Sequence, residues 1–143
     1  MNTAADLSDL AYRYYQVPAR FFAWVGIIAI VILSVIPAED RPLTGFGPPL
    51  EHFAAFSLVA AVFAIGYDMS LPRLVLVALV FCAGIELAQV PLPTRHARLS
   101  DFTVDFLSCC YAIVLVQFGK RKKRTPRAAV PAQEVEEAEP GRV

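Results

Sequence analysis

Four long apolar blocks dominate this chain and restrict what it can fold into. They cover about residues 21–37, 50–67, 73–90 and 102–118. At about 1.5 Å per residue, helices of this length span roughly 25–28 Å, close to the roughly 30 Å hydrocarbon core of a bilayer. The chain has 143 residues and is 57% hydrophobic, which is more apolar surface than a soluble chain of this size can bury. The blocks therefore predict an all-α, integral membrane four-helix bundle in residues 21–118.

The segments outside the blocks have a different composition. Residues 1–20 mix charges with several tyrosines, so a cytoplasmic segment is expected, and an interfacial helix and an unfolded tail both remain open for it. Block 21–37 could alone be a signal peptide, but Ile36-Pro37-Ala38 is a poor cleavage site, which favours a retained helix. Ser100 is expected to cap the fourth helix. Residues 119–143 are basic and then acidic, without apolar periodicity, which predicts a disordered C-terminal tail.

The basic residues predict the orientation of the chain, because Lys and Arg concentrate in cytoplasmic segments. Of those near the spans, four spans place nine on the side of both termini: Arg13, Arg20, Arg73, Lys120, Arg121, Lys122, Lys123, Arg124 and Arg127. The opposite side has only three: Arg41, Arg95 and Arg98. The expected location is the bacterial cytoplasmic (inner) membrane, multi-pass, with N- and C-termini cytoplasmic. A basic run directly after an apolar block also favours contact with anionic headgroups over a nucleic-acid partner.

Polar residues gather at the ends of the blocks that face outward. The predicted ligand-binding residues are His52, Glu86, Gln89, Arg95, Asp101 and Asp105. An ionisable group inside a span costs about 2.5–3.5 kcal/mol, so it usually pairs. We expect Glu86 to pair with Arg95 or His52. A pocket for an anionic headgroup and a purely structural ion-pair network are both consistent with this pattern.

Catalytic and metal-binding motifs are weak in this chain. It has no GxSxG, HExxH or Walker sequence. His52 and Glu86 are candidate general bases, but no catalytic residue is assigned, and whether the protein is an enzyme stays open. The three cysteines, Cys82, Cys109 and Cys110, lie inside apolar blocks without metal-ligand spacing. We expect no metal site and no cofactor.

The order of these polar residues along the chain resembles the VanZ-like family over about residues 25–118. The resemblance rests on four short stretches: Ser34-Val35-Ile36-Pro37, His52 with Phe56, Glu86-Leu87-Ala88-Gln89, and Pro93-Thr94-Arg95 followed by Asp101 and Asp105. This chain departs from the family at several places: no lysine shortly precedes His52, and Phe56, Thr94, Asp105 and Ser108 stand where tyrosine, glycine, asparagine and glycine are common.

The resemblance implies a membrane protein of the cell envelope, linked to tolerance of teicoplanin-type glycopeptide antibiotics, without implying a molecular activity. Three hypotheses follow. The first is a binding protein for an anionic envelope lipid or precursor, in which Arg95 engages the anion and His52 exchanges a proton. The second is a membrane enzyme that acts on a lipid-linked substrate. The third is a structural subunit that associates with another membrane protein or with its own copies.

Overall fold

The structure is a computed structural model that describes residues 3–37, 45–92 and 98–124, with side chains from Arg13 to Lys122. Within these ranges the chain forms four helices and no strand: α1 Thr3–Val35, α2 Pro48–Gly66, α3 Leu71–Gln89 and α4 Leu99–Arg124. Each contains a stretch long and apolar enough to cross a membrane. The expected all-α membrane bundle is confirmed, and the protein is a multi-pass membrane protein.

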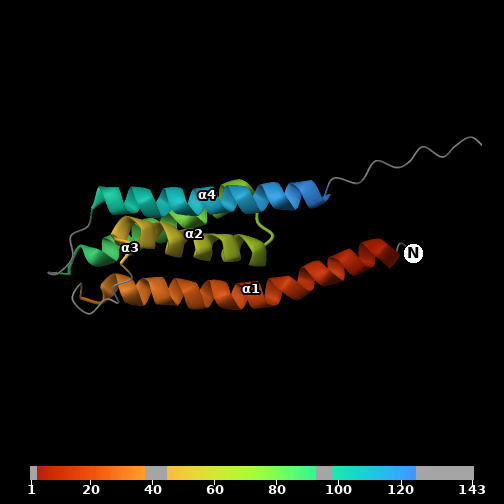
Figure 1. Ribbon diagram of the computed structural model, residues 1–143, viewed down its shortest axis with the longest axis horizontal. Helices are drawn as coiled ribbons and strands as arrows, with labels where there is room; N and C mark the ends of the chain where they lie inside the picture. Colours follow the sequence, from red (N-terminus) through yellow and green to blue (C-terminus); the bar gives the residue numbers. More distant parts are fainter. Residues whose placement is uncertain (1–2, 38–44, 93–97, 125–143) are drawn as a thin grey trace, which may run out of the picture.

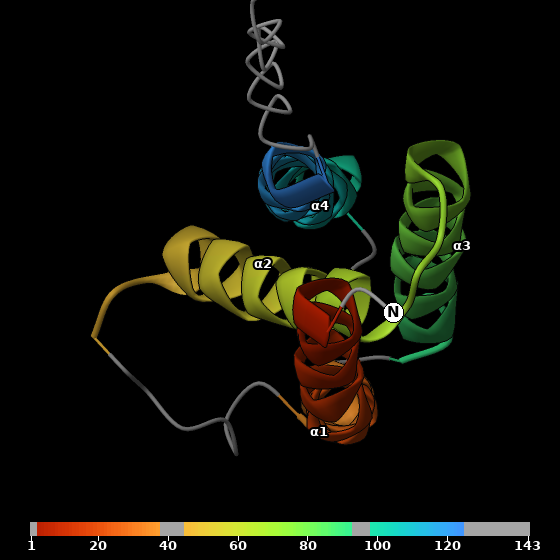
Figure 2. The ribbon, with the colours of Figure 1, turned by 90° about the vertical axis from the view of Figure 1, so that its right-hand side faces the viewer.

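The helices run up and down the bundle in alternating directions (Figure 1). The ends of α1 and α3 meet the starts of α2 and α4, and we call this the polar end because it contains His52, Glu86, Gln89 and Asp105. The other end, the basic end, contains Arg20 and Lys120. Seen along the axis, α2 lies between α1 and α4 (Figure 2), and it packs mainly against these two helices rather than against α3.

The first helix is longer than the apolar block that predicted it. The sequence indicated a separate segment over residues 1–20, whereas α1 runs without interruption from Thr3 to Val35 and contains Pro18. A proline inside a helix removes one hydrogen bond and clashes with the preceding turn, which kinks the helix where the helix continues past it. Figure 1 shows α1 changing direction near its middle.

The fourth helix also extends beyond its block at both ends. It begins at Leu99, so Ser100 lies in the first turn instead of capping it, and its hydroxyl donates to Asp101 Oδ1 over 3.0 Å. It continues to Arg124 through basic residues that were predicted to be disordered. Lys and Arg are good helix formers and are favourable near a helix C-terminus. Residues 125–143, the rest of the predicted tail, lie outside the described residues.

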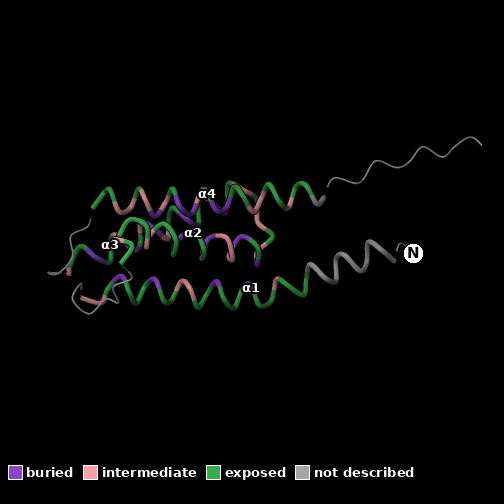
Figure 3. The backbone as a smooth tube through the Cα atoms, viewed as in Figure 1, coloured by how far each residue is buried: buried purple, intermediate pink, exposed green. Residues whose placement is uncertain are grey.

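Small residues bring α1 and α2 close together, as is common between membrane helices. A Cβ on Gly26 would lie 2.6 Å from Val59 Cγ2, and a Cβ on Gly66 would lie 3.0 Å from the backbone nitrogen of Arg20. Buried residues form narrow stripes that face the neighbouring helices, while the outward faces are exposed (Figure 3). Large apolar side chains such as Leu58 and Leu115 are among those exposed, and the hydrocarbon of a bilayer would cover them.

Candidate functional site

The polar end is organised around a pair between α2 and α4. His52 Nδ1 lies 2.9 Å from Asp105 Oδ1, and Asp105 is buried while His52 is partly exposed. Two prolines, Pro48 and Pro49, start α2 and place His52 one turn inside it. The His52 ring stacks on Phe56 one turn further along the helix, with ring centroids 6.1 Å apart. Asp105 therefore fixes the ring through Nδ1, and Phe56 supports one face of it.

A second contact of the polar end joins α3 to α1. Gln89 and Ser34 are both buried, and Gln89 Nε2 donates to the backbone oxygen of Ser34 over 3.3 Å. A third contact joins α2 to α4 about one turn beyond the His52–Asp105 pair, where Ser57 Oγ donates to the backbone oxygen of Ser108 over 3.2 Å. Each of these bonds connects two different helices, so polar side chains help to set the packing at this end of the bundle.

Glu86 occupies an unusual position between these contacts. Its Oε1 atom is buried and has no hydrogen-bond partner among the described residues. The backbone of Arg98 is placed to donate to the carboxylate, and His52, Asp101 and Asp105 are near enough to interact with it electrostatically. A buried acceptor without a donor is costly, so this oxygen is suited to a donor from the residues not described or from a ligand.

The predicted partners of Glu86 have different outcomes. His52 makes its ring hydrogen bond with Asp105 instead, because α2 packs against α4 and only weakly against α3. Arg95, the other predicted partner and the predicted anion-binding residue, lies outside the described residues. The structure therefore gathers five of the six predicted ligand-binding residues at one end: His52, Glu86, Gln89, Asp101 and Asp105.

The charges of the described polar end are mainly acidic. Glu51, Glu86, Asp101 and Asp105 are opposed there by Arg98, which is exposed. An anionic ligand at this place would need cations from the loop between α3 and α4, where Arg95 stands. Among the described residues no group of three His, Cys, Asp or Glu side chains is arranged to hold a metal ion, and the three cysteines are free thiols.

The basic end has a set of contacts that the sequence analysis did not predict. Arg20 Nε donates to the backbone oxygen of Gly66 over 2.8 Å, and its guanidinium lies 5.1 Å from the centre of the Tyr67 ring. Lys120 Nζ donates to the backbone oxygen of Ala64 over 2.7 Å. Cations from α1 and α4 thus satisfy carbonyls that the C-terminus of α2 leaves without helical partners.

The positions of Arg20 and Lys120 in the sequence could have indicated these contacts, but they were used only to predict the orientation of the chain. Arg20 precedes the first apolar block and Lys120 follows the fourth, so both lie at the depth at which α2 ends. In an alternating bundle, such flanking cations are placed to reach the carbonyls of an adjacent helix end.

Comparison with known proteins adds no relative to this description. No protein-family model matches the chain, and searches of curated proteins and of solved structures find no similar protein.

Proposed function

We propose that this protein binds the headgroup of an anionic envelope lipid or lipid-linked precursor at its polar end, as a VanZ-like protein of the bacterial cell envelope. The observation that carries the proposal is Glu86 Oε1, a buried acceptor without a partner among the described residues, next to the His52–Asp105 pair. Ionisable groups at membrane depth are expensive, and those retained there commonly mark functional sites.

The convergence of residues from all four helices supports a pocket over a scattered set of polar side chains. Ser34 comes from α1, His52 from α2, Gln89 from α3 and Asp105 from α4, and hydrogen bonds join them in pairs. The same residues carry the resemblance to the VanZ-like family, so that resemblance and the geometry point to one place in the bundle. Tolerance of teicoplanin-type antibiotics is the cellular role that the resemblance adds to the proposal.

The cation for the anionic headgroup would be Arg95, assisted by Arg98. A guanidinium offers a planar pair of donors that matches a phosphate or carboxylate. Glu86 would orient Arg95 by accepting one of its remaining N–H groups at Oε1. His52, held through Nδ1 by Asp105, would gain or lose a proton as the headgroup binds, because histidine titrates near neutral pH.

The polar end is proposed to face outward. Nine Lys and Arg residues near the spans on the side of the termini, against three on the other side, would hold the basic end in the cytoplasm. At that end α4 continues to Arg124 as a helix, and its basic residues would lie against anionic headgroups of the inner leaflet.

A ligand-stabilisation experiment tests the proposal. A ligand that binds only the folded protein raises its stability by mass action. Phosphatidylglycerol added to the detergent-solubilised protein should raise the unfolding midpoint more than phosphatidylcholine does. Arg95→Ala and Glu86→Gln should each reduce this difference by at least half, leaving the part that the basic end contributes. Arg73→Ala, at the basic end, is the control and should keep it. Equal stabilisation by both lipids, or a difference that both variants leave unchanged, would contradict headgroup binding at this site.

The His52–Asp105 pair favours one alternative function, a membrane enzyme that acts on a lipid-linked substrate. A histidine held at Nδ1 by a buried carboxylate is a common arrangement of a general base, and proton transfer would then occur at Nε2. If the protein is an enzyme, incubation with a bacterial lipid extract should release more than one molecule of product per molecule of protein. His52→Ala should stop this release. No product above the amount of protein would exclude turnover of these lipids.

A further inference from the structure

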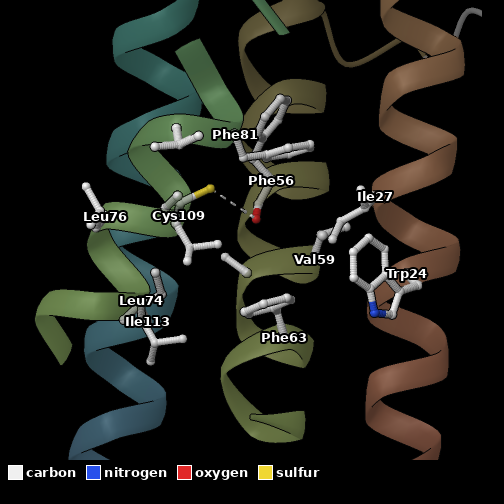
Figure 4. A pocket seen from close by; sticks show the side chains of 14 residues that line it. Trp24, Ile27, Phe56, Val59, Phe63, Leu74, Leu76, Phe81, Cys109 and Ile113 are labelled. Atoms are coloured by element: carbon white, nitrogen blue, oxygen red, sulfur yellow. Dashed lines mark hydrogen bonds between the residues drawn. The ribbon is translucent and has the colours of Figure 1, made fainter. Parts of the chain in front are cut away.

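An apolar groove lies between α1 and α3, in the half of the bundle nearer to the basic end. It has a volume of about 530 Å³, and its lining is almost wholly apolar. Trp24 and Ile27 of α1 stand on one side, and Leu76 of α3 stands on the other (Figure 4). The groove exists because α1 and α3 contact each other little, while α2 and α4 close its back.

The groove is open to the surroundings of the bundle rather than enclosed. Leu76 and Val80 line it and are exposed by 59% and 64%, respectively. Along α2 its lining runs from Phe56 to Phe63, about 10 Å at about 1.5 Å per residue. This stretch lies inside a span of 19 residues, from Pro48 to Gly66, and nearer to its basic end. Hydrocarbon would therefore surround the opening of the groove.

The dimensions of the groove decide what can fill it. Along α2 the groove is about 10 Å long, which is less than two turns of an α-helix at a pitch of about 5.4 Å. A membrane helix from a partner has five or more turns and would extend far beyond the groove at both ends. A single flexible hydrocarbon chain fits the same space without needing length or polar contacts.

We propose that this groove holds one hydrocarbon chain of a bilayer lipid. The chain enters sideways between α1 and α3, past Leu76 and Val80, and lies against Phe63 and Ile113. This inference goes beyond the proposed function, since it concerns a chain and holds whatever headgroup the polar end binds.

One end of the groove adjoins the polar end of the bundle. Phe56 lines the groove and stacks on His52, and the Cys109 thiol donates to the backbone oxygen of Phe56 over 3.8 Å (Figure 4). Cys109 also follows Asp105 by one helical turn. A chain in the groove consequently ends next to the His52–Asp105 pair, which places it where a lipid bound by its headgroup would extend into the bundle.

Photo-labelling tests this inference. The protein is placed in nanodiscs of phosphatidylglycerol and phosphatidylethanolamine that contain a small fraction of phosphatidylglycerol with a diazirine on one acyl chain. After illumination, the labelled residues are mapped by mass spectrometry. A chain in the groove should label the largely covered Phe63 and Ile113 at least as strongly as Leu58 and Leu115, which are 65% and 55% exposed outside it.

Filling the groove separates a bound chain from bulk lipid. Val77→Trp narrows the groove at a partly exposed lining position and should lower labelling of Phe63 and Ile113 at least threefold. Ala60→Leu narrows it from α2 and should act in the same direction. Ala88→Trp, on an exposed part of α3 outside the lining, is the matched control and should change nothing.

Two results would overturn the inference. One is labelling that follows exposure alone and is unchanged in both filling variants. The other is a cross-link between two copies of the chain through residues of the groove, which would assign the groove to a protein partner. Neither readout uses the polar residues, so a loss of headgroup binding in Glu86→Gln would leave the chain labelling in place.

Discussion

His52 Nδ1 and Asp105 Oδ1 are 2.9 Å apart across the contact between α2 and α4. Asp105 is almost completely buried while the His52 side chain is about one quarter exposed, at 4% and 23% respectively. The Asp105 carboxylate is therefore removed from solvent. Among the described residues, the His52 ring is the side chain that forms a hydrogen bond with it. The pair has a structural consequence that can be measured without knowledge of the ligand.

Replacing Asp105 should destabilise the protein more than replacing an exposed carboxylate. Asp105→Ala removes the acceptor of His52 and leaves a small cavity, and we expect a loss of about 1–2 kcal/mol in the free energy of unfolding. Asp105→Asn keeps an acceptor oxygen of the same size and should lose less than half as much. The measurement is unfolding in mixed micelles with added SDS, followed by far-ultraviolet circular dichroism.

Asp68→Ala is the control for this series, because Asp68 is exposed between α2 and α3. Its effect should stay below about 0.5 kcal/mol. Equal losses for Asp105→Ala and Asp68→Ala would show that the buried pair does not contribute to the stability of the fold.

Lys120 should stabilise the C-terminal end of α2. Lys120→Met removes the donor that reaches the backbone oxygens of Ala64 and Tyr67, over 2.7 and 3.4 Å. A carbonyl left without a partner costs about 1–3 kcal/mol when buried, and we expect a loss near the lower value because the contact is partly buried. Lys122→Met, on an exposed face of α4, should have almost no effect in the same unfolding assay. A loss of the same size in both variants would refute the capping contact.

The close approach of α1 and α2 should be sensitive to one methyl group. The added methyl of Gly26→Ala would lie 2.6 Å from Val59 Cγ2, so the helices must separate or Val59 must change rotamer. We expect a loss of about 1–3 kcal/mol, the usual cost of overpacking. Val59→Ala in the same chain should restore most of it, and a double-mutant cycle gives the coupling between the two positions.

Gly84→Ala is the matched control for the Gly26 variant. A Cβ at this position would meet no atom within 4 Å, and alanine is the better helix former by about 1 kcal/mol. The substitution should therefore be neutral or stabilising. Purely additive effects of Gly26→Ala and Val59→Ala would be incompatible with direct contact between them.

The proposed orientation predicts which turns a membrane-impermeant reagent reaches. In a chain without its three native cysteines, Ser100→Cys should react with an impermeant maleimide in intact spheroplasts. Ser70→Cys, exposed in the short connection at the basic end, should react only after lysis. The reverse pattern would place the polar end in the cytoplasm and exclude an outward-facing pocket.

The sequence was sufficient to predict the class of fold and most helix positions. Hydropathy locates the spans, and prolines in their first turns mark where α2 and α3 begin. The predicted ranges 50–67 and 73–90 agree with α2 and α3 to within two residues. The ends of α1 and α4 were missed because the blocks were limited to residues without charges, whereas α1 begins before Arg20 and α4 continues past Lys120.

The partners within the polar end could not be predicted from the sequence. Hydropathy gives the depth of a side chain along the membrane normal, whereas a contact also depends on which helices are neighbours. His52 was one of two expected partners of Glu86, beside Arg95. It lies near enough to Glu86 to interact electrostatically, but α2 packs against α4 rather than against the next helix in the chain, and its ring hydrogen bond is with Asp105. The capping of α2 by Lys120 depends on the same helix order.

Native mass spectrometry of the protein released from nanodiscs of total bacterial lipid is the most direct test of headgroup binding at the polar end. The wild type and the control Arg73→Ala should each retain one discrete anionic lipid or precursor. Arg95→Ala and Glu86→Gln should reduce its occupancy at least fivefold. A wild type that retains no discrete species, or the same occupancy in all four proteins, would contradict the account and favour a structural role for the His52–Asp105 pair and Glu86.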